Sequence, residues 1–215
     1  MKNKLLVLSI IPLLLLTACD KYRIHKNYGE YYVNKCESFI SSIDYDKNAD
    51  IVFIGDSITD FYPVKEYYPQ YKVANRGIAG DTTTGLKDRI DFSLYALNPK
   101  AVYMMIGINN IGNMFYDYEK LLKGIKKNLP DSKVVIASLT PIGWGNEPVV
   151  EANKKIVNYC EKYSYTYVDL YAHMVDTDDY YKIDDSCFTD GIHPSEKGYD
   201  IMTGLLTPIF AELLK

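Results

Sequence analysis

Five short apolar runs alternate with longer amphipathic stretches along the chain, and this alternation constrains the fold more than any other feature of the sequence. The runs are rich in β-branched and aromatic residues, which is typical of strands covered on both faces. Strands that alternate with helices at this spacing form parallel sheets through right-handed crossovers. We therefore predict a three-layer α/β/α sandwich with a five-stranded parallel sheet. The predicted strands lie at 51–54, in a segment that starts at residue 72, at 101–106, at 133–139 and at 165–170.

The stretches between these runs have helical periodicity. One helix is predicted after the second strand, and two more at 117–128 and 147–162. A final helix is predicted after Ser195, with Pro208 expected to kink it or to end its regular part. The residues expected to be buried along it are Tyr199, Met202, Leu206, Ile209 and Leu213.

The composition favours one domain behind a leader. The chain has 215 residues, of which 47% are hydrophobic, and no linker rich in Pro, Gly or Ser divides it. We divide it into a signal peptide at 1–18, a tether and N-terminal extension at 19–49, and the main domain at 50–215. The net charge is −4 and there is no basic cluster, which argues against nucleic acid as a partner.

The first residues have the pattern of an export signal. Lys2 and Lys4 precede an apolar run at 5–16, which is too short to span a bilayer. The run ends in Leu-Thr-Ala-Cys, which resembles the lipobox of bacterial lipoproteins, with Cys19 as the lipidated first residue of the mature chain. We therefore expect an extracytoplasmic protein, anchored to the bacterial cell membrane through Cys19. An ordinary cleavable signal with an incidental cysteine is the alternative.

The segment between the leader and the first strand is polar and rich in tyrosine. Part of it is predicted to be a tether, and residues 31–40 to form a helix that packs on the domain. Besides Cys19 the chain has three cysteines, without a Cys-x-x-Cys pair or a histidine at ligand spacing, so no metal site is expected. Whether two of them form a disulfide stays open. The apolar positions of the predicted helix are Tyr32, Cys36, Phe39, Ile40 and Ile43, and the other two cysteines are Cys160 and Cys187.

Ser57 follows the first predicted strand within the sequence Gly-Asp-Ser. Open α/β sheets place ligands and chemistry at the carboxyl ends of their strands, so this serine is a candidate nucleophile. The three residues are also common in turns, and the motif alone favours a simple turn. A catalytic role requires a base, an orienting acid and donors for an oxyanion elsewhere in the chain.

The segments after two further predicted strands carry candidate hydrogen-bond donors for an oxyanion. Gly80 lies in a glycine-rich turn before a helix, where an unobstructed backbone N–H can bind an anion. Asn109 follows the third predicted strand and can direct its side-chain amide toward the same edge of the sheet. The alternatives are a glycine required by the turn and an asparagine that closes a turn.

The search for a base is short because the chain has three histidines. His25 lies in the predicted tether. His173 follows Asp169 by four positions, which makes it a rival, whereas His193 follows Asp190 by three positions within one loop. That loop can carry an acid and an imidazole together and leave the outer ring nitrogen free for a serine. A loop histidine in a local cap, beside a turn aspartate, is the alternative.

Trp144 lies between two glycines in the loop after the fourth predicted strand. An aromatic face at this edge of the sheet is a candidate contact for a sugar ring. A loop aromatic packed on its own neighbours is the more general alternative.

Four separated segments together resemble the SGNH hydrolases, also called the GDSL-like lipase/esterase family. They are 55–59 for the nucleophile block, 75–81 for the glycine block, 107–110 for the asparagine block and 190–193 for the acid-histidine block. The resemblance covers about residues 50 to 214 and implies a flavodoxin-like SGNH fold. Two departures, Ile58 for leucine and Asn110 for aspartate, touch no catalytic role, and the second is also seen in the branch resembling platelet-activating-factor acetylhydrolases.

The resemblance implies a role for each site residue. Ser57 would be the nucleophile, His193 the general base and then acid, and Asp190 the orienting carboxylate. The backbone N–H groups of Ser57 and Gly80 and the side-chain amide of Asn109 would form the oxyanion hole. Asp169 and His173 would then be structural. A triad of this kind activates its own nucleophile, so neither a metal nor another cofactor is expected.

The sequence thus predicts a serine esterase that hydrolyses short acyl esters, such as acetyl esters on a small molecule or a polysaccharide, through an acyl-enzyme. A lysophospholipase or thioesterase would use the same residues, and so would a sugar O-acyltransferase. A binding module with an idle triad is a further alternative.

Overall fold

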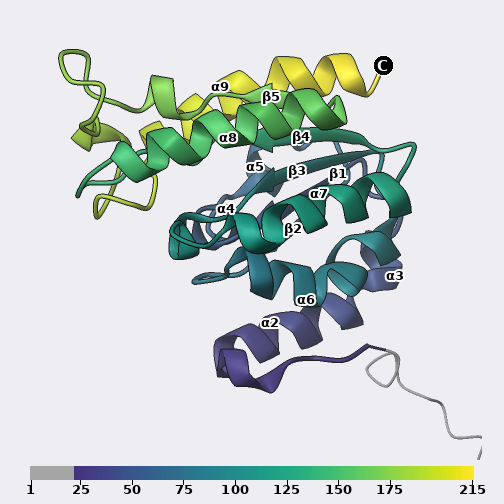
Figure 1. The fold of residues 1–215 in the computed structure, drawn as a ribbon. Coiled ribbons are helices and arrows are strands. Elements are labelled where there is room, and N and C mark those ends of the chain that lie inside the picture. The colour runs from purple at the N-terminus through teal and green to yellow at the C-terminus, as the bar shows by residue number, and fades with distance from the viewer. Residues whose placement is uncertain (1–21) are drawn as a thin grey trace, which may run out of the picture.

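The computed structural model describes residues 22–215 (Figure 1). The predicted signal peptide and the predicted lipidation of Cys19 lie outside this range. Within it, no helix has both the length and the apolar character needed to cross a membrane. Cys36, Cys160 and Cys187 are buried free thiols.

One parallel sheet with the strand order β2-β1-β3-β4-β5 forms the middle layer. The strands are β1 (Ile51–Gly55), β2 (Val73–Gly77), β3 (Ala101–Met105), β4 (Lys133–Ala137) and β5 (Thr166–Val168). The predicted five-stranded sheet is confirmed, and its order is that of flavodoxin-like doubly wound folds. Gly55 at the end of β1 pairs with Gly77 of β2 and Met105 of β3. The carboxyl ends of these three strands therefore lie side by side where the winding of the sheet reverses.

Helices cover both faces of this sheet. The α-helices are α2 (Glu30–Ser41), α3 (Ile43–Asp46), α4 (Ser57–Asp60), α5 (Val64–Tyr67), α6 (Thr83–Ser93), α7 (Phe115–Asn128), α8 (Glu147–Tyr163) and α9 (Glu196–Leu213), and the 3-10 helices are η1 (Lys26–Tyr28), η2 (Tyr95–Leu97), η3 (Ile108–Asn110), η4 (Tyr171–His173) and η5 (Asp185–Cys187). Figure 1 shows α6, α7 and α8 over one face and α9 over the other, with α4 and α5. On the second face the rings of Phe53 and Phe210 pack 5.7 Å apart. The three-layer prediction is therefore confirmed.

Helix α2 adds an outer layer against α6 (Figure 1). Its buried residues include Phe39 and Ile40, and they form a small apolar cluster with Ile78 and Phe92. The helix predicted at 31–40 is therefore present. Ile43, the last position of the predicted stripe, begins α3 and is partly buried.

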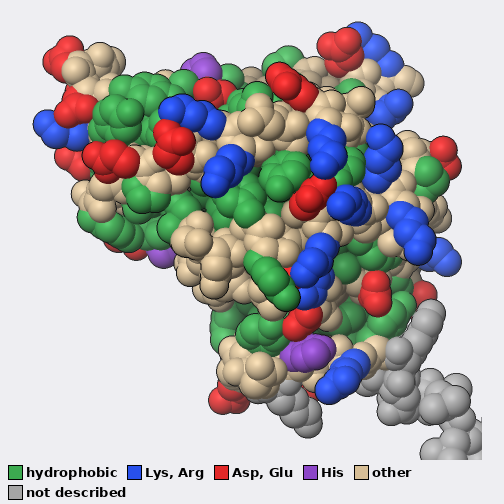
Figure 2. Space-filling model, in the orientation of Figure 1, with side chains coloured by type: hydrophobic (Ala, Val, Ile, Leu, Met, Phe, Trp, Pro, Cys, Tyr) green, Lys and Arg blue, Asp and Glu red, His purple; other side chains and the backbone are tan. Residues whose placement is uncertain are grey.

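On the face seen in Figure 2, basic side chains lie among acidic and apolar ones over α7 and α8. Glu119 illustrates this mixture, because its carboxylate lies 3.3 Å from the amine of Lys123 and 2.7 Å from that of Lys162. This face is therefore not a surface of one charge.

Helix α9 differs from its prediction in the residues that it buries. The helix continues through Pro208 to Leu213, so the proline does not end it, and the kink given as the other effect of Pro208 stays a prediction. Phe210 is fully buried, whereas Ile209 and Leu213 are only partly buried. The residues at 199, 202, 206 and 210 are three or four positions apart and share one helical face. Ile209 lies at the edge of that face and Leu213 in the last turn of the helix, and both pack against the core while partly exposed.

Candidate active site

Ser57 lies where β1 passes into α4 and is 5% exposed. The preceding residue, Asp56, caps α4 by accepting a hydrogen bond from the backbone N–H of Ile58 at 3.2 Å. From α9, the hydroxyl of Tyr199 donates to the carbonyl of Ile58 at 3.0 Å. The turn that carries Ser57 is therefore held by its own cap and by the helix on the second face of the sheet.

His193 lies between Ser57 and Asp190. Its Nε2 is 2.9 Å from Ser57 Oγ, and its Nδ1 is 2.7 Å from Asp190 Oδ2. The other oxygen of Asp190 accepts the backbone N–H groups of Ile192 at 3.1 Å and His193 at 2.8 Å. The backbone N–H of Thr189 donates to the carbonyl of His193 at 2.9 Å and closes the loop. Hydrogen bonds within one short segment thus hold the acid and the imidazole in position relative to each other.

These hydrogen bonds lower the pKa of Asp190 to about 2, chiefly through the side chain of His193. Asp190 is therefore a carboxylate at neutral pH. An ionised carboxylate beside Nδ1 favours the tautomer that carries its proton there. Nε2 is then free to accept the proton of Ser57, which is the arrangement required of a general base.

The predicted oxyanion donors lie on neighbouring loops. Gly80 is exposed and has a φ of +78°, in the left-handed region that favours glycine. In the described part of the chain, the N–H groups of Ser57 and Gly80 make no backbone hydrogen bond. Asn109 donates one N–H to the carbonyl of Asp81 at 2.9 Å, which leaves its second N–H for a ligand. The fold thus brings the asparagine to the loop that carries Gly80.

The rival histidine is engaged elsewhere. His173 lies in η4, and its Nδ1 is 2.9 Å from the backbone carbonyl of Asp169. The carboxylate of Asp169 instead accepts the backbone N–H of Ala172 at 3.1 Å. The pair closes a turn after β5, and it is His193 that reaches Ser57.

Two exposed aromatic residues flank the loop of Asp190 and His193. Trp144 is 64% exposed, and a Cβ placed on Gly191 would lie 3.8 Å from its ring. The ring centroid of Phe61, which is 51% exposed, lies 5.3 Å from that of His193. Phe61 was not predicted from the sequence. Its position four residues after Ser57, one helical turn along the chain, is the signal that could have identified it.

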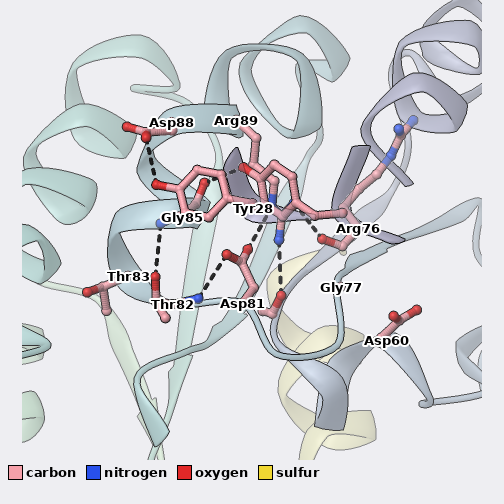
Figure 3. A network of polar contacts seen from close by, with 12 residues as sticks. Tyr28, Asp60, Arg76, Gly77, Asp81, Thr82, Thr83, Gly85, Asp88 and Arg89 are labelled. Atoms are coloured by element: carbon pink, nitrogen blue, oxygen red, sulfur yellow. Dashed lines mark hydrogen bonds and ion pairs between the residues drawn. The ribbon is translucent and has the colours of Figure 1, made fainter. Parts of the chain in front are cut away.

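A buried ion pair close to the site was also not predicted from the sequence. Arg89 of α6 donates from Nε to Asp81 at 2.8 Å, and its other nitrogens donate to the carbonyls of Arg76 at 2.8 Å and Gly55 at 3.0 Å (Figure 3). One guanidinium therefore joins the ends of β1 and β2 to the loop after β2. An arginine on the inward face of a predicted helix, eight positions after an aspartate, is the signal present in the sequence.

Asp56 is a second buried acid, directly beside Ser57. It is 0% exposed, and its Oδ2 has no hydrogen-bond partner among the described residues. Burial raises the pKa of Asp56 to about 7. Its protonation state therefore changes near neutral pH, although the ring nitrogens of His193 bond to Asp190 and Ser57.

The family whose model matches the chain is the GDSL-like lipase/acylhydrolase family, over residues 53–201. This range contains Ser57, Gly80, Asn109, Asp190 and His193. Among curated proteins, platelet-activating factor acetylhydrolase IB subunit alpha2 of Gallus gallus is 29% identical over 120 residues, which are 52% of this chain and 52% of that protein. The chain thus spans about half the length of the curated relatives that it matches.

Solved structures share the fold. A GDSL-like lipase from Bacteroides thetaiotaomicron is 21% identical with a TM-score of 0.71, and the alignment covers 84% of this chain and 97% of that one. An acetylxylan esterase from Geobacillus stearothermophilus is 20% identical with a TM-score of 0.60, covering 76% of this chain and 94% of that one.

Proposed function

The chain belongs to the GDSL-like lipase/acylhydrolase family, and we propose that it is a serine esterase that removes short acyl groups, such as acetyl, from carbohydrate through an acyl-enzyme. The observation that carries this proposal is the continuous contact from Ser57 through His193 to Asp190. Two hydrogen bonds of 2.9 and 2.7 Å join a nucleophile, a base and an ionised acid.

In the first half of the reaction, Ser57 Oγ forms a bond to the ester carbonyl carbon while its proton passes to His193 Nε2. The tetrahedral intermediate collapses, the bond to the alcohol oxygen breaks, and the imidazolium gives its proton to the leaving alcohol. In the second half a water molecule attacks the acyl-enzyme by the same route and releases the acid. Asp190 keeps its negative charge throughout and stabilises the imidazolium.

The carbonyl oxygen becomes negative in both halves of the reaction. The N–H groups of Ser57 and Gly80 and the second N–H of Asn109 are the donors available for it. Donors that are fixed in advance stabilise the transition state more than the ground state. In this mechanism the residues themselves supply the base and the oxyanion donors, so no cofactor takes part.

The choice of short acyl groups on carbohydrate has two supports. The acetylhydrolase and the acetylxylan esterase are both named for the removal of acetyl groups. The exposed rings of Phe61 and Trp144 beside the site can contact the apolar face of a sugar. We further propose that the protein is extracytoplasmic and held at the membrane through Cys19, which places it where polysaccharides and their fragments are found.

Hydrolysis of p-nitrophenyl acetate, butyrate and octanoate by the purified protein and its Ser57→Ala variant tests this function. We expect a preference for acetate that is lost in the variant, followed by release of acetate from acetylated oligosaccharides. A preference for octanoate would indicate that lipid esters are the substrates. Transfer of the acyl group to an added sugar, in place of free acid, would identify an acyltransferase. Full activity of Ser57→Ala would overturn the proposed nucleophile.

A further inference from the structure

Helix α2 carries two polar side chains that converge on one carboxylate beside the candidate site. Lys35 Nζ lies 2.6 Å from Asp60 Oδ1, and the hydroxyl of Tyr31 donates to Asp60 Oδ2 at 2.7 Å. Helix α2 lies outside residues 53–201, the part of the chain that matches the family. These contacts therefore belong to the N-terminal extension and not to the matched region.

Asp60 links the two loops that carry the backbone oxyanion donors. It ends the single-turn helix α4 that begins at Ser57, and its Oδ2 accepts the backbone N–H of Ala79 at 2.9 Å. Ala79 directly precedes Gly80. The backbones approach so closely here that a Cβ on Gly77 would lie 2.2 Å from the nitrogen of Asp60. The side chain of Asp60 thus sets the position of the loop of Gly80 relative to the turn of Ser57.

The charge of Asp60 explains why it has two partners on α2. Its side chain is 5% exposed, so water screens its charge poorly. An unpaired carboxylate next to the loop of Gly80 would oppose the negative charge that develops on the substrate oxygen. Lys35 neutralises this carboxylate. Burial and the bond to Asp60 raise the pKa of Tyr31 to about 12, so its hydroxyl stays a neutral donor.

We propose that Lys35 and Tyr31 are positioning residues that act through Asp60, holding the loop of Gly80 in place for oxyanion binding and cancelling the charge beside it. This inference rests on the proposed esterase function. It makes the N-terminal extension a part of the support of the active site, in addition to a connection to the membrane.

The test compares Lys35→Met, Lys35→Arg and Tyr31→Phe with a matched control. Lys100→Met is that control, because Lys100 forms an ion pair of 2.8 Å with Asp50 at the opposite end of β1. Two rates are measured: turnover of p-nitrophenyl acetate, and labelling of Ser57 by a fluorophosphonate. In the labelling reaction Ser57 Oγ bonds to phosphorus, the P–F bond breaks, fluoride leaves and His193 takes the serine proton. The phosphoryl oxygen then occupies the position of the oxyanion.

We expect Lys35→Met to lower kcat and the labelling rate about tenfold with KM within about twofold, a smaller loss than the ~10²–10³-fold cost of deleting an oxyanion donor. Tyr31→Phe should show a smaller loss of the same kind. Lys35→Arg should regain most of the rate, because arginine can pair with the same carboxylate. Lys100→Met should change neither rate. Melting temperatures separate these effects from unfolding.

A double variant tests the role of the charge. Asp60→Asn added to Lys35→Met removes the unpaired charge and keeps an oxygen that can accept the N–H of Ala79. We expect it to label faster than Lys35→Met alone. A double variant that labels no faster than Lys35→Met alone would contradict the electrostatic role.

The outcomes also separate this inference from the proposed function. Equal labelling rates for Lys35→Met, Tyr31→Phe and Lys100→Met would overturn the inference even if acetate esters are cleaved. Labelling that is lost in Ser57→Ala and slowed in Lys35→Met would support the inference, even if no acetate ester is cleaved and the substrate proposal fails.

Discussion

His193 and His173 each follow an aspartate closely in the chain, but only one of them contacts the serine. The carboxylate of Asp190 reaches Nδ1 of His193, whereas Nδ1 of His173 lies against a backbone carbonyl. The difference lies in the backbone. The loop at 190–193 folds its aspartate over its own N–H groups, which directs the second oxygen at the imidazole.

Exchange of each histidine for alanine is therefore expected to separate their roles. His193→Ala should lower kcat for p-nitrophenyl acetate by at least about 10³-fold, because the serine loses its base. His173→Ala should retain most of the wild-type kcat. The reverse pattern would show that the base lies on the turn after β5.

Asp56 predicts a dependence of stability on pH. The pKa of this acid rises from 3.8 to about 7 on folding, so the native state binds the proton more tightly than the unfolded chain. Stability from this group is therefore lost as pH rises from about 4 to about 7, and the loss is complete above that range. Asp56→Asn removes the cost of ionising this buried acid and keeps an oxygen that can accept the N–H of Ile58 at the cap of α4.

Thermal melting at pH 5 and pH 8 provides the measurement. We expect Asp56→Asn to melt above the wild type by at least about 4 °C at pH 8, with a smaller difference at pH 5. Asp50→Asn should show the opposite sign at pH 8, because the hydrogen bond from Lys100 lowers the pKa of Asp50. If the wild type melts above Asp56→Asn at pH 8, ionisation of Asp56 does not destabilise the folded state.

A buried ion pair joins helix α6 to the ends of two strands. The side chains of Arg89 and Asp81 are 0% and 1% exposed, and they join α6 to the ends of β1 and β2. A buried ion pair adds little to the free energy of unfolding compared with an apolar pair of similar volume. Removal of one partner is costly, however, because it leaves a buried charge without compensation.

Arg89→Met should accordingly lower the free energy of unfolding by about 3–5 kcal/mol. Urea unfolding at equilibrium measures this value, with Lys154→Met as a control. Lys154 forms an ion pair of 2.6 Å with Glu151 on the surface of α8, and its loss should cause no measurable change. Equal midpoints for the two variants would mean that the buried pair is not needed.

The whole chain joins a predicted membrane anchor, through α2, to the domain that matches the family. Cys19 lies 11 positions before Glu30, the first residue of α2. If Cys19 is lipidated, α2 lies close to the anchor in the chain, and it is also the helix whose Lys35 reaches Asp60.

Detergent phase partition of the protein expressed in bacteria tests this anchor. We expect the wild type in the detergent phase and Cys19→Ala in the aqueous phase, because one lost cysteine removes the acyl chains. Equal partition of both proteins into the aqueous phase would favour an ordinary cleavable signal.

Hydrophobic periodicity predicted the five strands, their parallel direction and most helices, because such patterns are local. Local turn chemistry likewise placed Ser57, Gly80, Asn109 and the loop at 190–193 beside the sheet. The short contacts from Ser57 to His193 and from His193 to Asp190 then follow from residues whose types and positions were already distinctive.

Other contacts could not be predicted in this way. Asp60 meets Lys35 and Ala79, which lie 25 and 19 positions away in the chain, and Arg89 reaches the carbonyl of Gly55 across 34 positions. None of these pairs has a periodic or turn signal. Lysine, arginine and aspartate are also ordinarily solvated, so their types do not indicate burial. Packing of α6 against the sheet and of α2 against α6 removes water from these side chains. Only then does each charge require a partner that the rest of the fold supplies.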